Sequence, residues 1–120
     1  MANTFKVINF AAEPNSAGTP FTMYTVASST TTVVLGLILA NIHSSAVTAE
    51  VELVSTTSNR AGANNASNGT SFLVKDVNIP SGSSLELLSG GKVVLEAGDV
   101  VRVDCSVADK LSGTLSVMEI

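Results

Sequence analysis

Polar and apolar residues alternate along several segments of this chain. Residues 47–55 are the clearest case: Val47, Ala49 and Val51 would face one side, while Glu50 and Glu52 face the other. Strict alternation of this kind predicts a half-buried β-strand. The same pattern, or a short apolar run bounded by turn residues, predicts eight or nine short strands, at residues 5–10, 22–27, 32–41, 47–55, 72–79, 84–88, 92–95, 101–107 and 113–120.

Two further features refine these strands. The segment TVVLGLILAN (32–41) is almost continuously apolar, which is typical of a strand covered on both faces, and Gly36 in its middle predicts a bulge or a close backbone approach. The sequence SGG (89–91) predicts a hairpin turn that joins residues 84–88 to residues 92–95.

The spacing of the strands predicts the fold class. Turn signals recur at short intervals, and Gly98 before Asp99 predicts a tight reversal with a positive φ at the glycine. No segment repeats apolar residues at a helical spacing over three turns with capping residues. We therefore expect a single all-β domain over residues 1–120, an antiparallel β-sandwich that is Ig-like or jelly-roll-like.

The longest connection is a low-complexity stretch, STTSNRAGANNASNGTS (55–71), which has no large apolar residue. It predicts a long hairpin loop or a bulged excursion, with Asn68-Gly69 as the tightest turn signal. Residues 65–67 and 68–70 match the glycosylation acceptor pattern, but such matches arise by chance in an Asn- and Ser-rich loop. We expect residues 56–71 to act as an arm that orders against a neighbour in an assembly.

Composition excludes several classes of protein. The chain has 120 residues, one Cys and a net charge of −4, so neither a disulfide framework nor a nucleic-acid-binding module is expected. The first residues lack a basic start and a long apolar segment, which argues against a signal peptide, and no apolar run approaches the roughly twenty residues of a membrane span. Charged residues make up 13% of the chain, about half the usual share, which favours a protein partly covered by neighbours.

Candidate catalytic groups are few. His43 stands beside Ser44 and Ser45, but a hydrolase would need an aspartate to fold back onto the histidine: Asp99, Asp104 or Asp109. We expect an exposed loop imidazole instead. The same aspartates could suggest a calcium site, yet their spacing is not that of a calcium-binding loop. We expect Asp99 to bond its own turn and Asp104 to lie on the wet face of its strand.

The remaining polar and thiol groups also have structural interpretations. Cys105 shares the apolar face of its strand with Val103 and is expected to behave as a small buried hydrophobe. Glu50 and Glu52 are expected to be solvated carboxylates or to pair across strands, with Lys75 or Arg102. The sequence therefore predicts no catalytic residue, no cofactor and no metal ligand, and we do not expect an enzyme.

A family resemblance covers most of the chain. The phrases IPSGSSL (79–85), GKVVLEAGDVVRV (91–103) and LSVMEI (115–120) resemble the closing sequence of small virion structural proteins of tailed bacteriophages, common in environmental and cyanobacterial phages. Residues 22–27, 33–41 and 47–53 look like the earlier strands of that family. The long insertion at 56–71 departs from the short turn expected there.

The resemblance implies a non-enzymatic structural protein of the virion, made in the host cytoplasm. We expect a capsid decoration (cement) protein that forms a homo-oligomer, for example a trimer, and bridges major capsid subunits on the outer shell. The partners would be the major capsid protein or other virion proteins, with no nucleic acid and no membrane. The uncharged stretch 14–49 is the candidate interface, because interface cores are depleted in charge. A plain pair of buried strands would lack charged residues in the same way, and this alternative stays open. The alternatives are a tail, collar or baseplate component and, less favoured because aromatic residues are scarce, a carbohydrate-binding β-sandwich module.

Overall fold

The computed structural model describes residues 3–55, 69–88 and 90–120. Nine β-strands account for most of these residues: β1 (Thr4–Glu13), β2 (Phe21–Thr25), β3 (Thr32–Asn41), β4 (Val47–Val54), β5 (Thr70–Ile79), β6 (Ser84–Leu87), β7 (Val93–Leu95), β8 (Val100–Cys105) and β9 (Leu111–Glu119). The predicted arm, residues 56–71, and the acceptor pattern at 65–67 lie wholly or mostly outside the described residues. The strands on either side, β4 and β5, form the predicted antiparallel hairpin.

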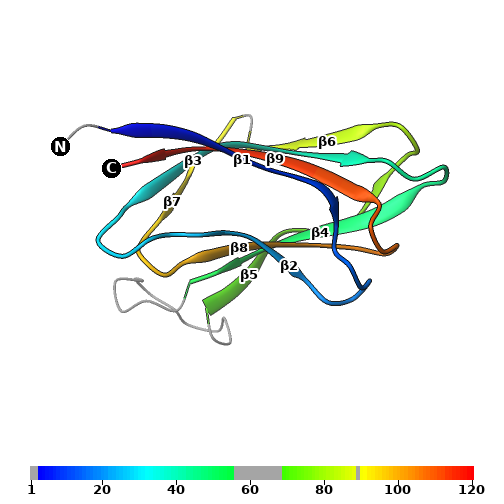
Figure 1. Cartoon of the computed structure of the whole chain (residues 1–120), viewed down its shortest axis with the longest axis horizontal. Coiled ribbons are helices and arrows are strands. Elements are labelled where there is room, and N and C mark those ends of the chain that lie inside the picture. The colour runs from blue at the N-terminus through cyan, green and yellow to red at the C-terminus, as the bar shows by residue number, and fades with distance from the viewer. Residues whose placement is uncertain (1–2, 56–68, 89) are drawn as a thin grey trace.

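The strands pair from the two ends of the chain inward. β1 pairs with β9, β2 with β8, β3 with both β6 and β7, and β4 with β5, all antiparallel. Sheet A has the order β1-β9-β3-β6, with β7 also on β3, and sheet B has the order β2-β8-β4-β5. Figure 1 shows the two sheets as separate layers. A long antiparallel ribbon folded over in this way is a jelly roll, so the expected β-sandwich is confirmed in its jelly-roll form.

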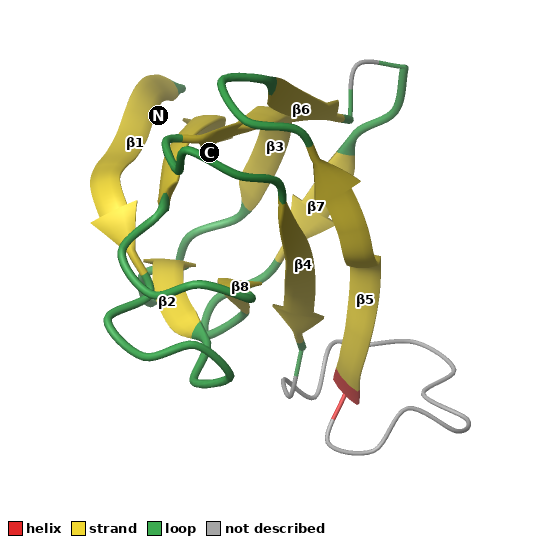
Figure 2. Cartoon of the chain, turned by 90° about the vertical axis from the view of Figure 1, so that its right-hand side faces the viewer, coloured by secondary structure: helices red, strands yellow, loops and turns green. Residues whose placement is uncertain are grey.

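The core lies between the two sheets and is built mainly from Val and Leu. Along β3, Val34, Leu37 and Leu39 point inward and are buried, and Leu115 and Val117 of β9 lie beside them. Figure 2 shows the layers from the side. β-Branched and γ-branched side chains suit this space, because they pack densely on a pleated surface.

The prediction for β3 holds in its bounds but is wrong in its burial. A register shift against β9 lies between Val34 and Gly36, so the predicted bulge is confirmed. The strand is not covered on both faces, however, since the outward-facing Ile38 is 45% exposed. The continuous apolar run has a different cause: β3 lies at the centre of sheet A and presents apolar side chains to the outside as well.

The predicted hairpin at residues 89–91 is wrong. β6 and β7 do not pair with each other but with successive parts of β3, β6 along Leu37–Ala40 and β7 along Thr32–Val34. β6 and β7 therefore run in the same direction and together form one edge of sheet A, which is interrupted between them. Leu88, with φ of 66°, turns the chain at the break. A glycine pair after a serine resembles a hairpin turn in sequence, but the strands on either side of it both pair with β3 instead of with each other.

The turn at Gly98 is as predicted. Its φ is 90°, a left-handed conformation that a side chain disfavours. The carboxylate of Asp99 accepts a hydrogen bond from the Glu96 backbone N–H at 2.9 Å, which confirms the predicted turn chemistry. The Gly98 N–H also donates to the Val26 carbonyl at 3.0 Å, so the turn is tied to the chain after β2.

Candidate assembly interface

The outer face of sheet A carries a row of apolar side chains. Phe5, Met118, Val33 and Val94 are direct cross-strand neighbours, from β1, β9, β3 and β7 in turn. Phe5 is 71% exposed and Val94 59% exposed, and both are large hydrophobic residues. A contiguous exposed apolar patch on a soluble domain commonly marks a contact surface.

Neighbouring rows on this face are weakly polar. Val7 of β1, 64% exposed, lies opposite Ser116 of β9. In a further row, Ile38 lies between Thr114 and Glu86, and Glu86 is the charged residue of that row. Low charge with exposed aliphatic and aromatic groups is the composition of an interface core. We call the face formed by Phe5, Val7, Val33, Ile38, Val94 and Met118 the outer apolar face.

The predicted interface at residues 14–49 contributes part of this face. β3 supplies Val33 and Ile38, whereas its alternate residues belong to the core. β2 and β3 lie in different sheets, so the stretch is not a buried strand pair. The sequence prediction did not include Phe5, Val7 or Val94 in the interface. For Phe5 and Val7 the sequence did hold a signal, because apolar residues at alternate positions predict one apolar face of a strand.

The outer face of sheet B is charged instead. The guanidinium of Arg102 donates to the carboxylate of Glu52, and the Lys75 ammonium lies 3.6 Å from the Glu50 carboxylate. The predicted cross-strand pairing is therefore confirmed for both glutamates. Glu52 is buried rather than solvated, because Arg102 covers it. Burial raises the pKa of Glu50 above its ordinary value, and the positive charge of Lys75 opposes that shift.

Asp104 is not on a wet face, contrary to the sequence prediction. Its side chain is buried and accepts hydrogen bonds from the backbone N–H groups of Gly18, at 3.1 Å, and of Cys105, at 2.8 Å. The loop between β1 and β2 covers this end of β8. Asp104 therefore has a structural role, since a buried carboxylate needs such donors.

His43 is half-buried in the β3–β4 connection, rather than fully exposed as predicted. Its backbone N–H donates to the Asn41 side chain at 2.7 Å, and its carbonyl accepts from the Ser81 hydroxyl at 2.6 Å. Within the described part of the chain, no hydrogen bond joins its imidazole to Asp99, Asp104 or Asp109. The structure does not assemble the hydrolase arrangement.

The other candidate groups follow their structural interpretations. Cys105 is a free thiol and is buried, as predicted. Among the described residues, no three His, Cys, Asp or Glu side chains are grouped so that they could hold a metal ion. The described chain also contains no helix that is long and apolar enough to cross a membrane.

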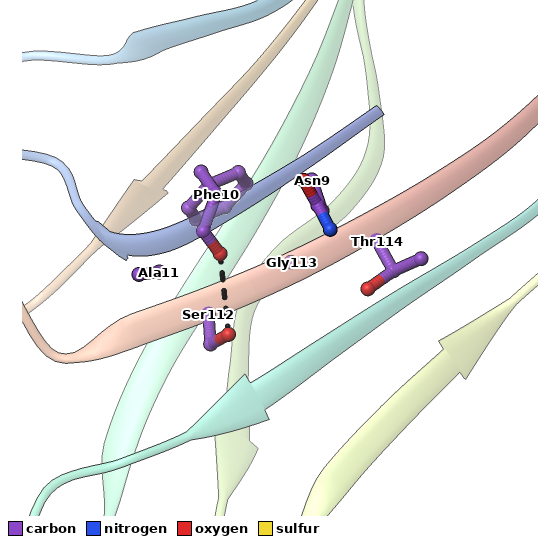
Figure 3. Close-up of a pocket in the computed structure, with 6 residues that line it drawn as sticks. All are labelled: Asn9, Phe10, Ala11, Ser112, Gly113 and Thr114. Carbon is purple, nitrogen blue, oxygen red and sulfur yellow. Dashed lines mark hydrogen bonds between the residues drawn. The ribbon is translucent and has the colours of Figure 1, made fainter. Parts of the chain in front are cut away.

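A shallow hollow of about 350 Å³ lies where β1 and β9 pair (Figure 3). Gly113 forms its floor beside the Phe10 ring, and the Ser112 hydroxyl donates to the Phe10 carbonyl at 3.2 Å. Asn9 and Thr114 flank it on the outward side. The residues that line the hollow include no titratable group, so the hollow offers no catalytic arrangement.

Comparison with known proteins supports the fold. No family model matches this sequence, and no curated protein matches it either. A chain of the T13 IBDV viral particle shares the fold with a TM-score of 0.50 at 10% identity, over 98% of this chain and 30% of that one. A protein of Bacillus endospore appendages, described as disulfide-linked pili, aligns over 98% of this chain and 85% of that one, with 15% identity and a TM-score of 0.46. The fold of this chain is thus similar to that of part of a viral-particle chain.

Proposed function

We propose that this chain is a non-enzymatic structural protein of a virion, and specifically a capsid decoration (cement) protein. The observation that carries the proposal is the outer apolar face, where Phe5 and Val94 expose large hydrophobic side chains at the two margins of one cross-strand row. The resemblance of the closing sequence to virion proteins of tailed phages supports a location of this protein in the virion. The similarity in fold to a chain of a viral particle is consistent with it.

The mechanism is preferential binding to the assembled shell. Burial of apolar area contributes about 25 cal/mol per Å², and in the row from Phe5 to Val94 the outer apolar face offers this area without a charged group that would have to be desolvated. A protein that binds the assembled lattice better than free subunits stabilises the lattice by mass action. Bridging adjacent capsid subunits achieves this, because the bridged surface exists only after assembly.

The test measures binding of purified protein to particles that lack it. Val94→Glu places a carboxylate in the apolar row at an exposed position, so it should fold and yet bind particles about tenfold or more weakly. Thr22→Glu is the matched control, because Thr22 is exposed on the outer face of sheet B. Equal binding of Val94→Glu and wild-type protein would refute the assignment of this face.

Copy number separates the capsid from the tail. A decoration protein should be present in purified virions at a copy number comparable to that of the major capsid protein. A few copies per particle would instead favour a tail, collar or baseplate component. Quantitative mass spectrometry of purified virions makes the distinction.

A further inference from the structure

The jelly roll leaves four sheet edges, and one of them differs from the others. The edges are β1 and the β6/β7 side in sheet A, and β2 and β5 in sheet B. A free edge exposes unpaired N–H and C=O groups that can pair with a strand of another molecule. Proteins usually protect such edges by shortness, bulges or charge, so an unprotected edge calls for a partner.

Three of the edges are protected. β6 and β7 have four and three residues, and β2 has five residues with a register shift between Thr22 and Tyr24. β5 is longer, but its pairing with β4 contains two register shifts, and Asp76 in it has a φ of 51°. None of these edges presents a long regular strand to a partner.

β1 is the exception. It has ten residues, and its pairing with β9 is unbroken from Thr4 opposite Glu119 to Phe10 opposite Gly113. Figure 2 shows β1 at the margin of the molecule, with no strand beyond it among the described residues. A regular strand with two exposed hydrophobic residues, Phe5 and Val7, is a typical template for strand addition.

The ladder shows which backbone groups of β1 are free. Thr31 and Ile120 exchange backbone hydrogen bonds, so Ile120 turns its N–H and C=O groups toward β3. These groups alternate in direction along a strand, so the even-numbered residues of β9 also bond β3 and its odd-numbered residues bond β1. The β1 partners of those odd residues are Thr4, Lys6, Ile8 and Phe10. Phe5, Val7 and Asn9 therefore turn their N–H and C=O groups to the free edge.

The single lysine of this strand does not protect it. An edge lysine ordinarily blocks pairing because its charge must stay in water. Here the Lys6 ammonium lies 2.8 Å from the Glu119 carboxylate, on the side of the sheet that faces the core. Its charge is compensated within the subunit, and the free edge between Phe5 and Asn9 carries no other charged side chain.

We propose that two copies of this chain pair through β1, antiparallel, about a two-fold axis at Val7. This register sets Val7 opposite Val7 of the second copy and Phe5 opposite Asn9, so that all three residues with free backbone groups are used in each copy. Each sheet A then continues into the other, and the two outer apolar faces become one surface. A second copy is the partner that fits, because the regular part of β1 from Thr4 to Phe10 is centred on Val7 and is thus complementary to itself.

This inference deepens the proposed function and rests on it for its biological role. Its test uses purified protein without particles, so the two can fail separately. Sedimentation over a range of concentrations measures the monomer–dimer equilibrium of the wild type and of Val7→Pro. Proline removes the free N–H at the centre of the pair but no hydrogen bond of the β1–β9 ladder, so the monomer should fold.

Asn78→Pro is the matched control. The Ser106 backbone N–H donates to the Thr48 carbonyl, so Thr48 turns its backbone groups toward β8 and away from β5. Asn78 is the partner of Thr48 on edge strand β5, and its own backbone N–H and C=O groups therefore point to solvent. We expect the wild type and Asn78→Pro to dimerise with similar dissociation constants, and that of Val7→Pro to rise about tenfold or more. A wild type that stays monomeric, or a Val7→Pro variant that dimerises normally, would overturn the proposal.

Amide hydrogen exchange on the wild type gives a readout that does not depend on any variant. The amides of Phe5, Val7 and Asn9 should exchange rapidly at low concentration and become protected as the dimer forms. Those of Lys6 and Ile8, which are already in the ladder with β9, should change little. A dimer without this alternating gain in protection would place the contact elsewhere and refute pairing through β1.

Discussion

The hydroxyl of Tyr24 donates a hydrogen bond to the carboxylate of Glu119 at 2.6 Å and so joins the two sheets across their shared margin. Tyr24 belongs to β2 in sheet B and Glu119 to β9 in sheet A. Burial, and then the hydrogen bond to Glu119, raises the pKa of Tyr24, which keeps the hydroxyl a donor. The ion pair of Glu119 with Lys6 adds β1 to the same cluster.

This cluster predicts a stability that depends on acid pH. The Lys6 ammonium, and then the Tyr24 hydroxyl, lowers the pKa of Glu119 below its ordinary value of 4.5. A lowered carboxyl pKa means that the folded state binds the proton less well than the unfolded state, so this stabilisation is present above pH 4.5 and is lost as the pH falls through the folded-state value. Glu119→Gln should therefore be less stable than the wild type at pH 7, with the difference shrinking in acid.

Urea unfolding at pH 7 and at pH 3 measures this change. Glu86→Gln removes the same charge from an exposed position on sheet A and serves as the control. An equal difference between Glu119→Gln and the wild type at both pH values would contradict the prediction.

The turn at Gly98 predicts a backbone effect. Gly98→Val forces a β-branched residue to a φ of 90°, which should cost about 1–3 kcal/mol of unfolding free energy. Gly36→Ala is the control, because an added Cβ there meets no atom within 4 Å and the backbone is not left-handed. Denaturant unfolding compares the two variants, and unchanged stability of Gly98→Val would exclude the requirement for glycine.

Gly113 predicts a packing effect that the sequence did not indicate. An added Cβ would lie 2.6 Å from Cζ of Phe10 and 3.2 Å from Cδ2 of Leu39. The Phe10 ring also packs edge-on against Phe21, with centroids 5.1 Å apart, so it has little freedom to move. Gly113→Ala should thus destabilise the fold by about 1–3 kcal/mol. The double variant with Phe10→Leu should recover part of the loss in thermal unfolding, whereas strictly additive effects would contradict the contact.

The burial of Cys105 predicts that a hydroxyl in place of its thiol would lower the stability of the fold. The residue is 3% exposed and lies between the sheets with Val103. Cys105→Ser should lower the unfolding free energy by about 1–3 kcal/mol and leave assembly intact. A thiol reagent should react with the native wild type far more slowly than with the unfolded chain. Rapid reaction in the native state would show that the thiol is not buried.

Local patterns allowed much of the fold to be predicted. The alternation in residues 47–55 and the turn at Gly98 depend on near neighbours, and both appear as expected. The choice of the jelly roll over the Ig-like arrangement could not be made, because it depends on which distant strands pair. The same reason explains the wrong hairpin at 89–91: β6 and β7 pair with β3, whose partner residues lie 44 to 63 positions earlier in the chain.

The candidate site was predicted less well than the fold. Low charge in residues 14–49 predicted a contact surface, and β3 supplies the centre of the outer apolar face through Val33 and Ile38. The margins of that surface come from Phe5 and Val94, which join it through strand register alone. Asp104 alternates onto the outward side as the pattern indicates, but its burial depends on the loop at Gly18, which no strand pattern reports.

The position of β9 has a consequence for synthesis on the ribosome. β9 follows the eight other described strands in the chain, yet it lies in the middle of sheet A, between β1 and β3. Until it emerges, β1 has no partner and the inner edge of β3 remains open, whereas the hairpin of β4 and β5 can already close. Because long-range strand pairing is slow and leaves edges exposed, the nascent chain should need protection by chaperones until β9 is made.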